Sequence, residues 1–153
     1  MPSRRDAITM TPAEIDEFLH GRRVMNVATI GPSGHPHLVA MWYGFLDGKP
    51  AFWTFGKSQK ILNLRRDNKI TALVEDGEKY SELRGVELVG TGTIVEDYDT
   101  LVALGKSVSE RYTGPVTDET LPFIEGQARK RLGVVIDVER TVTWDHTKLG
   151  GAY

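Results

Sequence analysis

The residues best suited to ligand chemistry lie in segment 54–60, which reads Thr-Phe-Gly-Lys-Ser-Gln-Lys. This segment joins a predicted strand to a predicted helix, and the unpaired amides at the start of a helix attract anions. Gly56 allows a close backbone approach, and Ser58 offers a hydroxyl group. Lys57 and Lys60 add positive charge. These residue types suit a phosphate group, whereas the alternative interpretation is a plain serine cap followed by a solvated basic turn.

Two predicted strands next to this segment are rich in apolar and aromatic side chains. One contains Val39, Ala40, Met41 and Trp42, and the other contains Phe52, Trp53 and Thr54. A flat aromatic ligand needs an apolar shelf of this kind with a few backbone donors beside it. The same side chains are also typical of a barrel core, and the two tryptophans would also suit a dimer interface.

Basic side chains are concentrated within segment 54–60 and just after it. They are Lys57, Lys60, Arg65, Arg66 and Lys69. One interpretation is a solvated helix face, which is what most such runs are. The other is a groove for an anionic tail that extends beyond one phosphate. The formal net charge of −2 gives no general attraction for nucleic acid, so we expect no nucleic-acid partner.

Other kinds of catalytic site are poorly supported. His35 and His37 would share one strand face, but no third ligand follows at a recognisable spacing, so we predict no metal site. Asp145 and His146 are neighbours that would point to opposite faces of a strand, which argues against a catalytic triad. The chain has no cysteine, and this excludes disulfides, thiol catalysis and cysteine-based zinc sites. Nucleotide-binding and serine-hydrolase motifs are absent.

Length and composition predict one ordinary globular domain spanning residues 1–153, because two separate cores would each be small. The sequence is 40% hydrophobic and 26% charged, as is usual for globular proteins. It shows no secretory signal and no apolar run of about 20 residues. We therefore expect a cytoplasmic protein without a membrane partner.

The local patterns predict a mainly β fold with peripheral helices. Thr11, Pro12 and Glu14 mark the start of a helix that ends near Gly21. Strands are expected at 24–30, 37–46, 51–55, 69–75, 83–96, 133–138 and 141–146, and further helices at 58–67, after Asp97, and in pieces over 118–131. In the helix 58–67 we expect Ile61, Leu62 and Leu64 to face inward. No repeated βαβ units occur, so a small antiparallel barrel is favoured over a parallel sheet.

These residues together resemble the pyridoxamine 5′-phosphate oxidase-like superfamily of split β-barrel flavoproteins. Within it, the chain is most similar to the flavin/deazaflavin oxidoreductase B group of F420-dependent reductases. The resemblance covers nearly the whole chain and rests on these motifs: Val27-Ala28-Thr29 with segment 31–37, Gly56-Lys57-Ser58-Gln59-Lys60 with Asn63-Leu64, Leu83-Arg84-Gly85-Val86, and Trp144-Asp145-His146-Thr147-Lys148-Leu149.

The resemblance implies a split β-barrel that binds its cofactor as a homodimer. Lys57, Ser58 and Lys60 would hold the cofactor phosphate, with Gln59 and Asn63 beside them. The implied ring neighbours are Val39, Ala40, Met41, Trp42, Trp53 and Thr54. Trp144, His146 and Lys148 lie in the carboxyl-terminal segment, and in the homodimer this segment of one subunit would close the pocket of the other.

The implied activity is transfer of hydride from reduced F420 to a conjugated small molecule such as a quinone, enone or tetrapyrrole. The basic residues favour F420, whose oligoglutamate tail carries several carboxylates. The alternatives are an FMN-dependent oxidoreductase on the same fold and a non-catalytic F420 carrier. Vitamin B6 oxidation is not expected, because the fuller arginine-rich phosphate motif is missing. No catalytic side chain is assigned, and Tyr43, His37 or solvent would deliver the proton.

Overall fold

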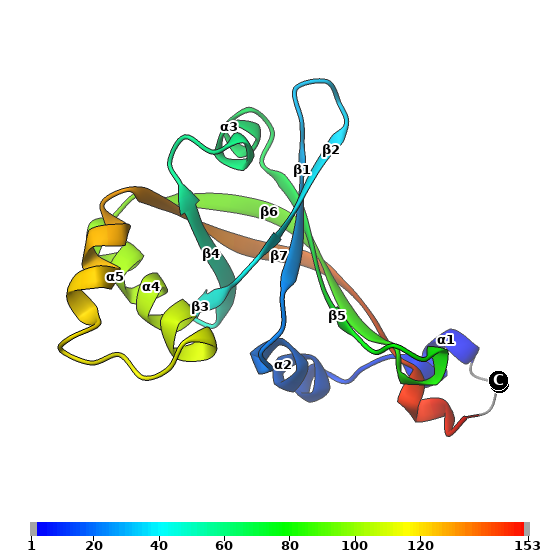
Figure 1. Ribbon diagram of the computed structural model, residues 1–153. Coiled ribbons are helices and arrows are strands. Elements are labelled where there is room, and N and C mark those ends of the chain that lie inside the picture. The colour runs from blue at the N-terminus through cyan, green and yellow to red at the C-terminus, as the bar shows by residue number, and fades with distance from the viewer. Residues whose placement is uncertain (1–2, 152–153) are drawn as a thin grey trace.

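The computed structural model describes residues 3–151 and shows a curled antiparallel sheet with helices around it (Figure 1). The strands are β1 (Met25–Ile30), β2 (Pro36–Met41), β3 (Gly44–Leu46), β4 (Lys49–Phe55), β5 (Lys69–Asp76), β6 (Arg84–Val95) and β7 (Arg131–Asp145). The helices are α1 (Arg4–Ile8), α2 (Pro12–His20), α3 (Gln59–Arg66), α4 (Tyr98–Tyr112) and α5 (Leu121–Ala128), with short 3₁₀ turns η1 (Tyr80–Glu82) and η2 (His146–Leu149).

The sheet order is β2-β1-β5-β6-β7-β4-β3, and every neighbouring pair is antiparallel. The long strands β6 and β7 cross the molecule and join its two halves (Figure 1). Their register shifts between Val89 and Gly90. A side chain at Gly90 would place its Cβ 2.0 Å from the carbonyl oxygen of Asp137, so the bulge requires glycine.

The two edges of this sheet are joined by a very short link. β2 lies at one edge and β3 at the other, yet β2 ends at Met41 and β3 begins at Gly44. The three Cα–Cα steps from Met41 to Gly44 span at most about 11 Å of extended chain, so the sheet must curl until its edges meet at residues 42–43. Away from this link β2 and β4 diverge, with α3 beyond the end of β4 (Figure 1). The result is a barrel that is closed at one end and split at the other.

Arg111 and Tyr43 hold this closed end. The Tyr43 side chain is fully buried, and its hydroxyl donates to the carbonyl of Leu19. The Arg111 guanidinium, on the last turn of α4, donates to the carbonyl of Tyr43 at 2.8 Å. It also donates to the carbonyls of Leu19, His20 and Gly21 at the end of α2. A cation is favoured at these carbonyls, because the end of a helix carries partial negative charge.

The same link orients Trp42. Its indole stacks on the ring of Tyr112, with the ring centroids 4.7 Å apart and the planes parallel. The Tyr112 hydroxyl in turn donates to the carbonyl of Arg23 at 2.6 Å. Trp42 is therefore held by packing although 53% of its surface is exposed.

Two apolar cores lie on opposite faces of β4. The larger core fills the barrel and includes Phe52 of β4 together with Ile61 of α3. The smaller core lies under α4 and includes Ala51 and Leu104, with Trp53 packed against it. Because successive strand residues point to opposite faces, β4 separates the barrel interior from the α4 side.

The structure confirms the mainly β class, the split barrel and the capped helix α2, where Thr11 and Glu14 form a reciprocal capping box. Two strand predictions were wrong. Segment 37–46 is broken at residues 42–43 by the turn between sheet edges, and segments 133–138 and 141–146 belong to one bulged strand, β7. Leu62 is 52% exposed and does not face inward as predicted. No helix within residues 3–151 combines the length and apolar character needed to cross a bilayer.

We expect Arg111→Met to lower the free energy of unfolding by about 2–3 kcal/mol, because it removes charge-assisted hydrogen bonds that close the barrel. Arg65→Met is the matched control, since Arg65 pairs with Glu96 at the surface and such pairs contribute about 0–1 kcal/mol. Urea unfolding followed by far-UV circular dichroism measures both. An equal loss of unfolding free energy in the two variants would show that Arg111 does not stabilise the closed end.

Candidate functional site

The start of α3 presents unpaired donors, as the sequence predicted. Ser58 is the N-cap residue, but its side chain makes no capping hydrogen bond. The amides of Gln59 and Lys60 find no acceptor among residues 3–151. Free amides at a helix start carry partial positive charge, so this end of α3 favours an anion.

Lys60 places a buried charge beside these amides. Only 9% of its surface is exposed, and its Nζ donates to Thr54 Oγ1 at 2.9 Å. Thr54 Oγ1 in turn donates to Ser58 Oγ at 3.3 Å. Within the described chain, no carboxylate pairs with Lys60, and burial lowers the pKa of its ammonium. An ammonium has three donors, so this group is only partly satisfied by one neutral hydroxyl.

Lys57 is the second free cation of this corner. It is exposed and contacts no acid in the described part of the chain. Other basic residues of the predicted groove have partners: Arg65 pairs with Glu96 and Lys69 with Asp67, while Arg66 donates to a backbone carbonyl. The basic groove is therefore reduced to what we call the anion corner, which consists of Thr54, Lys57, Ser58 and Lys60.

Asn63 and Gln59, which were predicted beside the cofactor, interact with each other. Asn63 is fully buried, and its Nδ2 donates to Thr29 Oγ1 at 3.0 Å. Its Oδ1 accepts from Gln59 Nε2 at 2.7 Å. These bonds fix α3 against β1. Asn63 thus orients the anion corner from beneath it, with no surface left for a ligand.

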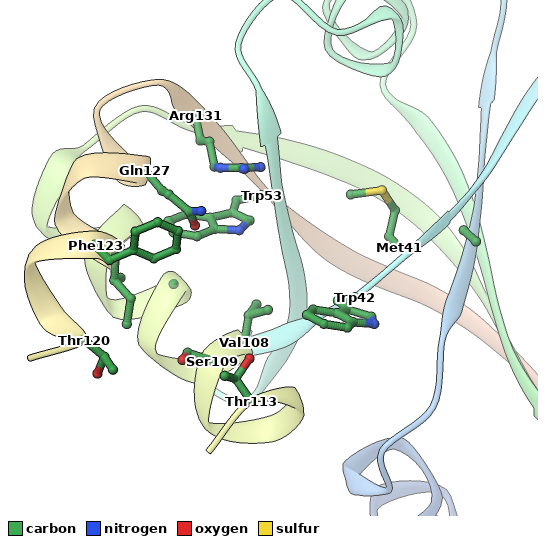
Figure 2. A pocket seen from close by; sticks show the side chains of 13 residues that line it. Met41, Trp42, Trp53, Val108, Ser109, Thr113, Thr120, Phe123, Gln127 and Arg131 are labelled. Carbon is green, nitrogen blue, oxygen red and sulfur yellow. The ribbon is translucent and has the colours of Figure 1, made fainter. Parts of the chain in front are cut away.

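A pocket with a volume of about 560 Å³ lies between β2, β4, α4 and α5 (Figure 2). We call it the aromatic pocket, and it is lined mainly by apolar side chains. The residues that line it are Ala40, Met41, Trp42, Trp53, Gly105, Val108, Ser109, Thr113, Thr120, Phe123, Ile124, Gln127 and Arg131. Four of the six predicted ring neighbours are among them, whereas Val39 packs against the barrel core. Gly105 admits Trp53, because a Cβ there would lie 2.4 Å from the indole.

Trp53 and Thr54 show how the two parts are related. They are consecutive on β4 and point to opposite faces, Trp53 into the aromatic pocket and Thr54 toward Lys60. The predicted site is therefore two adjoining surfaces on one strand. One is charged and lies at the start of α3, and the other is apolar and lies under α4 and α5.

Sequence reasoning missed Arg131. This residue was placed at the end of a helix, but it begins β7 and pairs with Phe55 across the sheet. Its guanidinium carbon lies 5.2 Å from the Trp53 ring centroid and 4.7 Å from that of Phe55. Burial lowers the pKa of the Arg131 guanidinium. The pairing of residues so distant in the chain left no local signal in the sequence.

The carboxyl-terminal residues of the predicted site lie far from the anion corner. Trp144 packs on Gly85, where a Cβ would be 2.2 Å from the indole, and His146 Nδ1 lies 2.8 Å from the carbonyl oxygen of Tyr80. Lys148 pairs with Glu14 at 2.8 Å. Arg131, which pairs with Phe55 next to the corner, begins β7, whereas Trp144 lies near the far end of this strand and His146 and Lys148 follow it in η2. Fifteen strand residues extend over about 45 Å. Within the described chain they do not meet the corner.

Tyr43 is removed from the candidate proton donors. Its hydroxyl is buried away from both parts of the site, and burial raises the pKa of Tyr43 to about 12. His37 remains a candidate, with its Nδ1 buried and without a hydrogen-bond partner in the described chain. His35 and His37 belong to no group of three metal-ligating side chains within residues 3–151.

Comparison with known proteins identifies a family that matches this chain. The sequence profile of the pyridoxamine 5′-phosphate oxidase family matches residues 11–145. A solved structure of a conserved hypothetical protein from Mycobacterium tuberculosis is 49% identical, with a TM-score of 0.92, covering 97% of this chain and 93% of that one. An F420 reductase is 26% identical, with a TM-score of 0.64 and coverages of 82% and 94%. No curated protein matches the chain.

The fold also occurs in proteins with other ligands. The heme storage protein HutZ from Vibrio cholerae has a TM-score of 0.67 at 15% identity, covering 88% of this chain and 96% of that one. A likeness at this identity shows a shared fold alone.

We expect Lys60→Met to raise the free energy of unfolding by about 1 kcal/mol, because it replaces a buried, unpaired cation with an apolar side chain of similar length. Lys106→Met, at an exposed position of α4, should leave stability unchanged. Urea unfolding at neutral pH compares both with the wild type. A destabilised Lys60→Met protein would mean that Lys60 is already well satisfied inside the folded chain.

The extra stability of Lys60→Met over the wild type should decrease as the pH rises. Because the pKa of Lys60 is lower in the folded chain, the unfolded chain binds more protons between that pKa and the ordinary value of 10.5. Wild-type stability therefore recovers as the pH rises through this window. The advantage of Lys60→Met should be complete below the window and shrink toward pH 10.5, and an advantage that grows with pH would contradict the account.

Proposed function

This chain belongs to the pyridoxamine 5′-phosphate oxidase family, and from that premise we propose that it binds coenzyme F420 and reduces a conjugated small molecule. The observation that carries the proposal is the buried ammonium of Lys60, which has a neutral hydroxyl as its one partner in the described chain. A buried cation that lacks an acid favours an anionic ligand strongly, since little water is present to screen it.

The anion corner fits a phosphate monoester. Lys60 has unused donors, Lys57 is free, and the amides of Gln59 and Lys60 point out of the start of α3. The Ser58 hydroxyl, which accepts from Thr54 Oγ1, belongs to the same corner. These groups supply both charge and directed hydrogen bonds, which is what phosphate oxygens need.

The choice of F420 over FMN has two supports. An F420 reductase shares 26% identity with this chain and matches it over 94% of its own length. In addition, Lys57 is exposed at the rim of the corner and has no acid partner within residues 3–151, so it can meet carboxylates that extend beyond a phosphate.

The aromatic pocket would position the reactants. When bound, a reduced deazaflavin supplies a hydride for an electron-poor carbon. Met41, Trp42 and Trp53 form an apolar wall that orients a flat molecule and excludes water. Among the described residues that line the pocket there is no cysteine, lysine or carboxylate, so the protein's contribution there is placement and desolvation. The proton would come from His37 or from solvent.

We further propose that the site is completed in a homodimer. Leu38 on β2 and Trp42, which directly follows this strand, are exposed at 66% and 53% of their surfaces. Exposed apolar side chains in a row on an edge strand are typical of an interface. A second subunit covering these side chains would also supply Trp144, His146 and Lys148 to the first.

Titration of the purified protein with F420, FMN and heme, followed by tryptophan fluorescence, separates the possible ligands. We expect F420 to bind most tightly and to be oxidised, in its reduced form, by at least one quinone or enone. FMN bound most tightly would favour the FMN-dependent enzyme. Tight F420 binding without any accepted substrate would favour a carrier.

We expect Lys57→Ala to weaken F420 binding by about 1–3 kcal/mol, a five- to 150-fold rise in Kd, because it removes a charged donor. Lys60→Met should weaken binding at least as much while the protein becomes more stable. Lys106→Ala is the control, as it removes an exposed lysine elsewhere. Unchanged F420 affinity in both Lys57→Ala and Lys60→Met would remove the phosphate assignment.

A further inference from the structure

Arg131 is the one cation among the residues that line the aromatic pocket. Its guanidinium extends from β7 across Trp53 toward the side of the pocket that holds Met41 (Figure 2). Phe55, beside Trp53 on the same face of β4, also lies under the guanidinium. Aromatic rings that cover the faces of a guanidinium leave its N–H edge free for an acceptor.

The edge of Arg131 lacks such an acceptor among residues 3–151. Its Nε is buried and has no hydrogen-bond partner among residues 3–151, and no carboxylate there forms an ion pair with it. Buried donors in folded proteins are nearly always paired, so an unpaired one calls for an explanation. By comparison, Arg111 donates to backbone carbonyls at the closed end, and Arg23 donates to Asp76 and to the carbonyl of Phe18.

The other residues that line the pocket indicate which kind of ligand would carry that acceptor. Trp42, Trp53, Phe123 and Ile124 offer flat apolar contacts, and the volume of about 560 Å³ is that of a small-molecule site. Gln127 and Ser109 add neutral polar groups. A single cation at one end of an apolar pocket selects an apolar ligand with one anionic group.

We propose that Arg131 receives a carboxylate, and that the molecule reduced in the aromatic pocket is a flat, conjugated carboxylic acid. This inference rests on the proposed function, since it names the substrate class of the same site. A carboxylate matches the guanidinium edge with two parallel hydrogen bonds. The cofactor phosphate is assigned elsewhere, because Lys60 and Thr54 meet on the opposite face of β4.

The test compares naphthoate with naphthamide, which share a ring system and differ in charge. Isothermal titration calorimetry measures their binding to the full chain without cofactor. For the wild type we expect naphthoate to bind about tenfold more tightly, as for a hydrogen bond to a charged group. In Arg131→Gln the two probes should bind within about twofold of each other, because the charge is gone.

Two further variants keep the result interpretable. Arg131→Lys retains the charge without the fork, so it should restore part of the preference for naphthoate. Arg129→Gln, at an exposed arginine two residues away, should leave the preference intact. Naphthamide binding by Arg131→Gln reports that the pocket is still folded.

Equal affinity of the wild type for the two probes would overturn the proposal, and so would a naphthoate preference that survives Arg131→Gln. A loss of F420 affinity in Arg131→Gln with naphthoate preference retained would assign Arg131 to the cofactor and would also overturn it. The probes are measured without F420, so failure of the wild type to bind F420 would refute the proposed function alone.

Discussion

Residues 42–43 connect strands at opposite edges of the sheet, and this short link governs the shape of the whole molecule. The sheet must curl to bring its edges together, and the burial of Tyr43 with Arg111 of α4 holds the closure. The same link places Trp42 in the lining of the aromatic pocket. The constraint that closes the barrel thus also builds one wall of the site.

Some basic side chains in this structure have acidic partners, whereas others do not. Arg23 and Arg84 share the carboxylate of Asp76, and Arg65 and Lys49 have surface partners. Lys60 and Arg131 are the exceptions, because each is partly desolvated and neither pairs with a carboxylate in the described chain. They lie on the two sides of β4, Lys60 beside Thr54 and Arg131 in the aromatic pocket, and each is the centre of one of the two anion sites that we propose. A folded protein tolerates such unpaired charges at functional sites, where a ligand supplies the missing partner.

Local signals in the sequence predicted most elements. The capping box of α2, the Asp97 cap of α4 and the alternating strands depend on neighbours a few residues apart, so they could be inferred directly. The break at residues 42–43 and the unbroken β7 could not, because both follow from strand pairings across the sheet. Arg131 was missed for the same reason, since its place in the pocket depends on its pairing with Phe55. The resemblance to the family supplied Trp144, His146 and Lys148, which do not meet the corner within the described chain.

The most direct test of the account is a crystal structure of the protein with bound F420. The account predicts the cofactor phosphate within hydrogen-bonding distance of Lys60 Nζ and of the first amides of α3. It is contradicted if the phosphate lies elsewhere while the ammonium of Lys60 stays bonded to Thr54 alone.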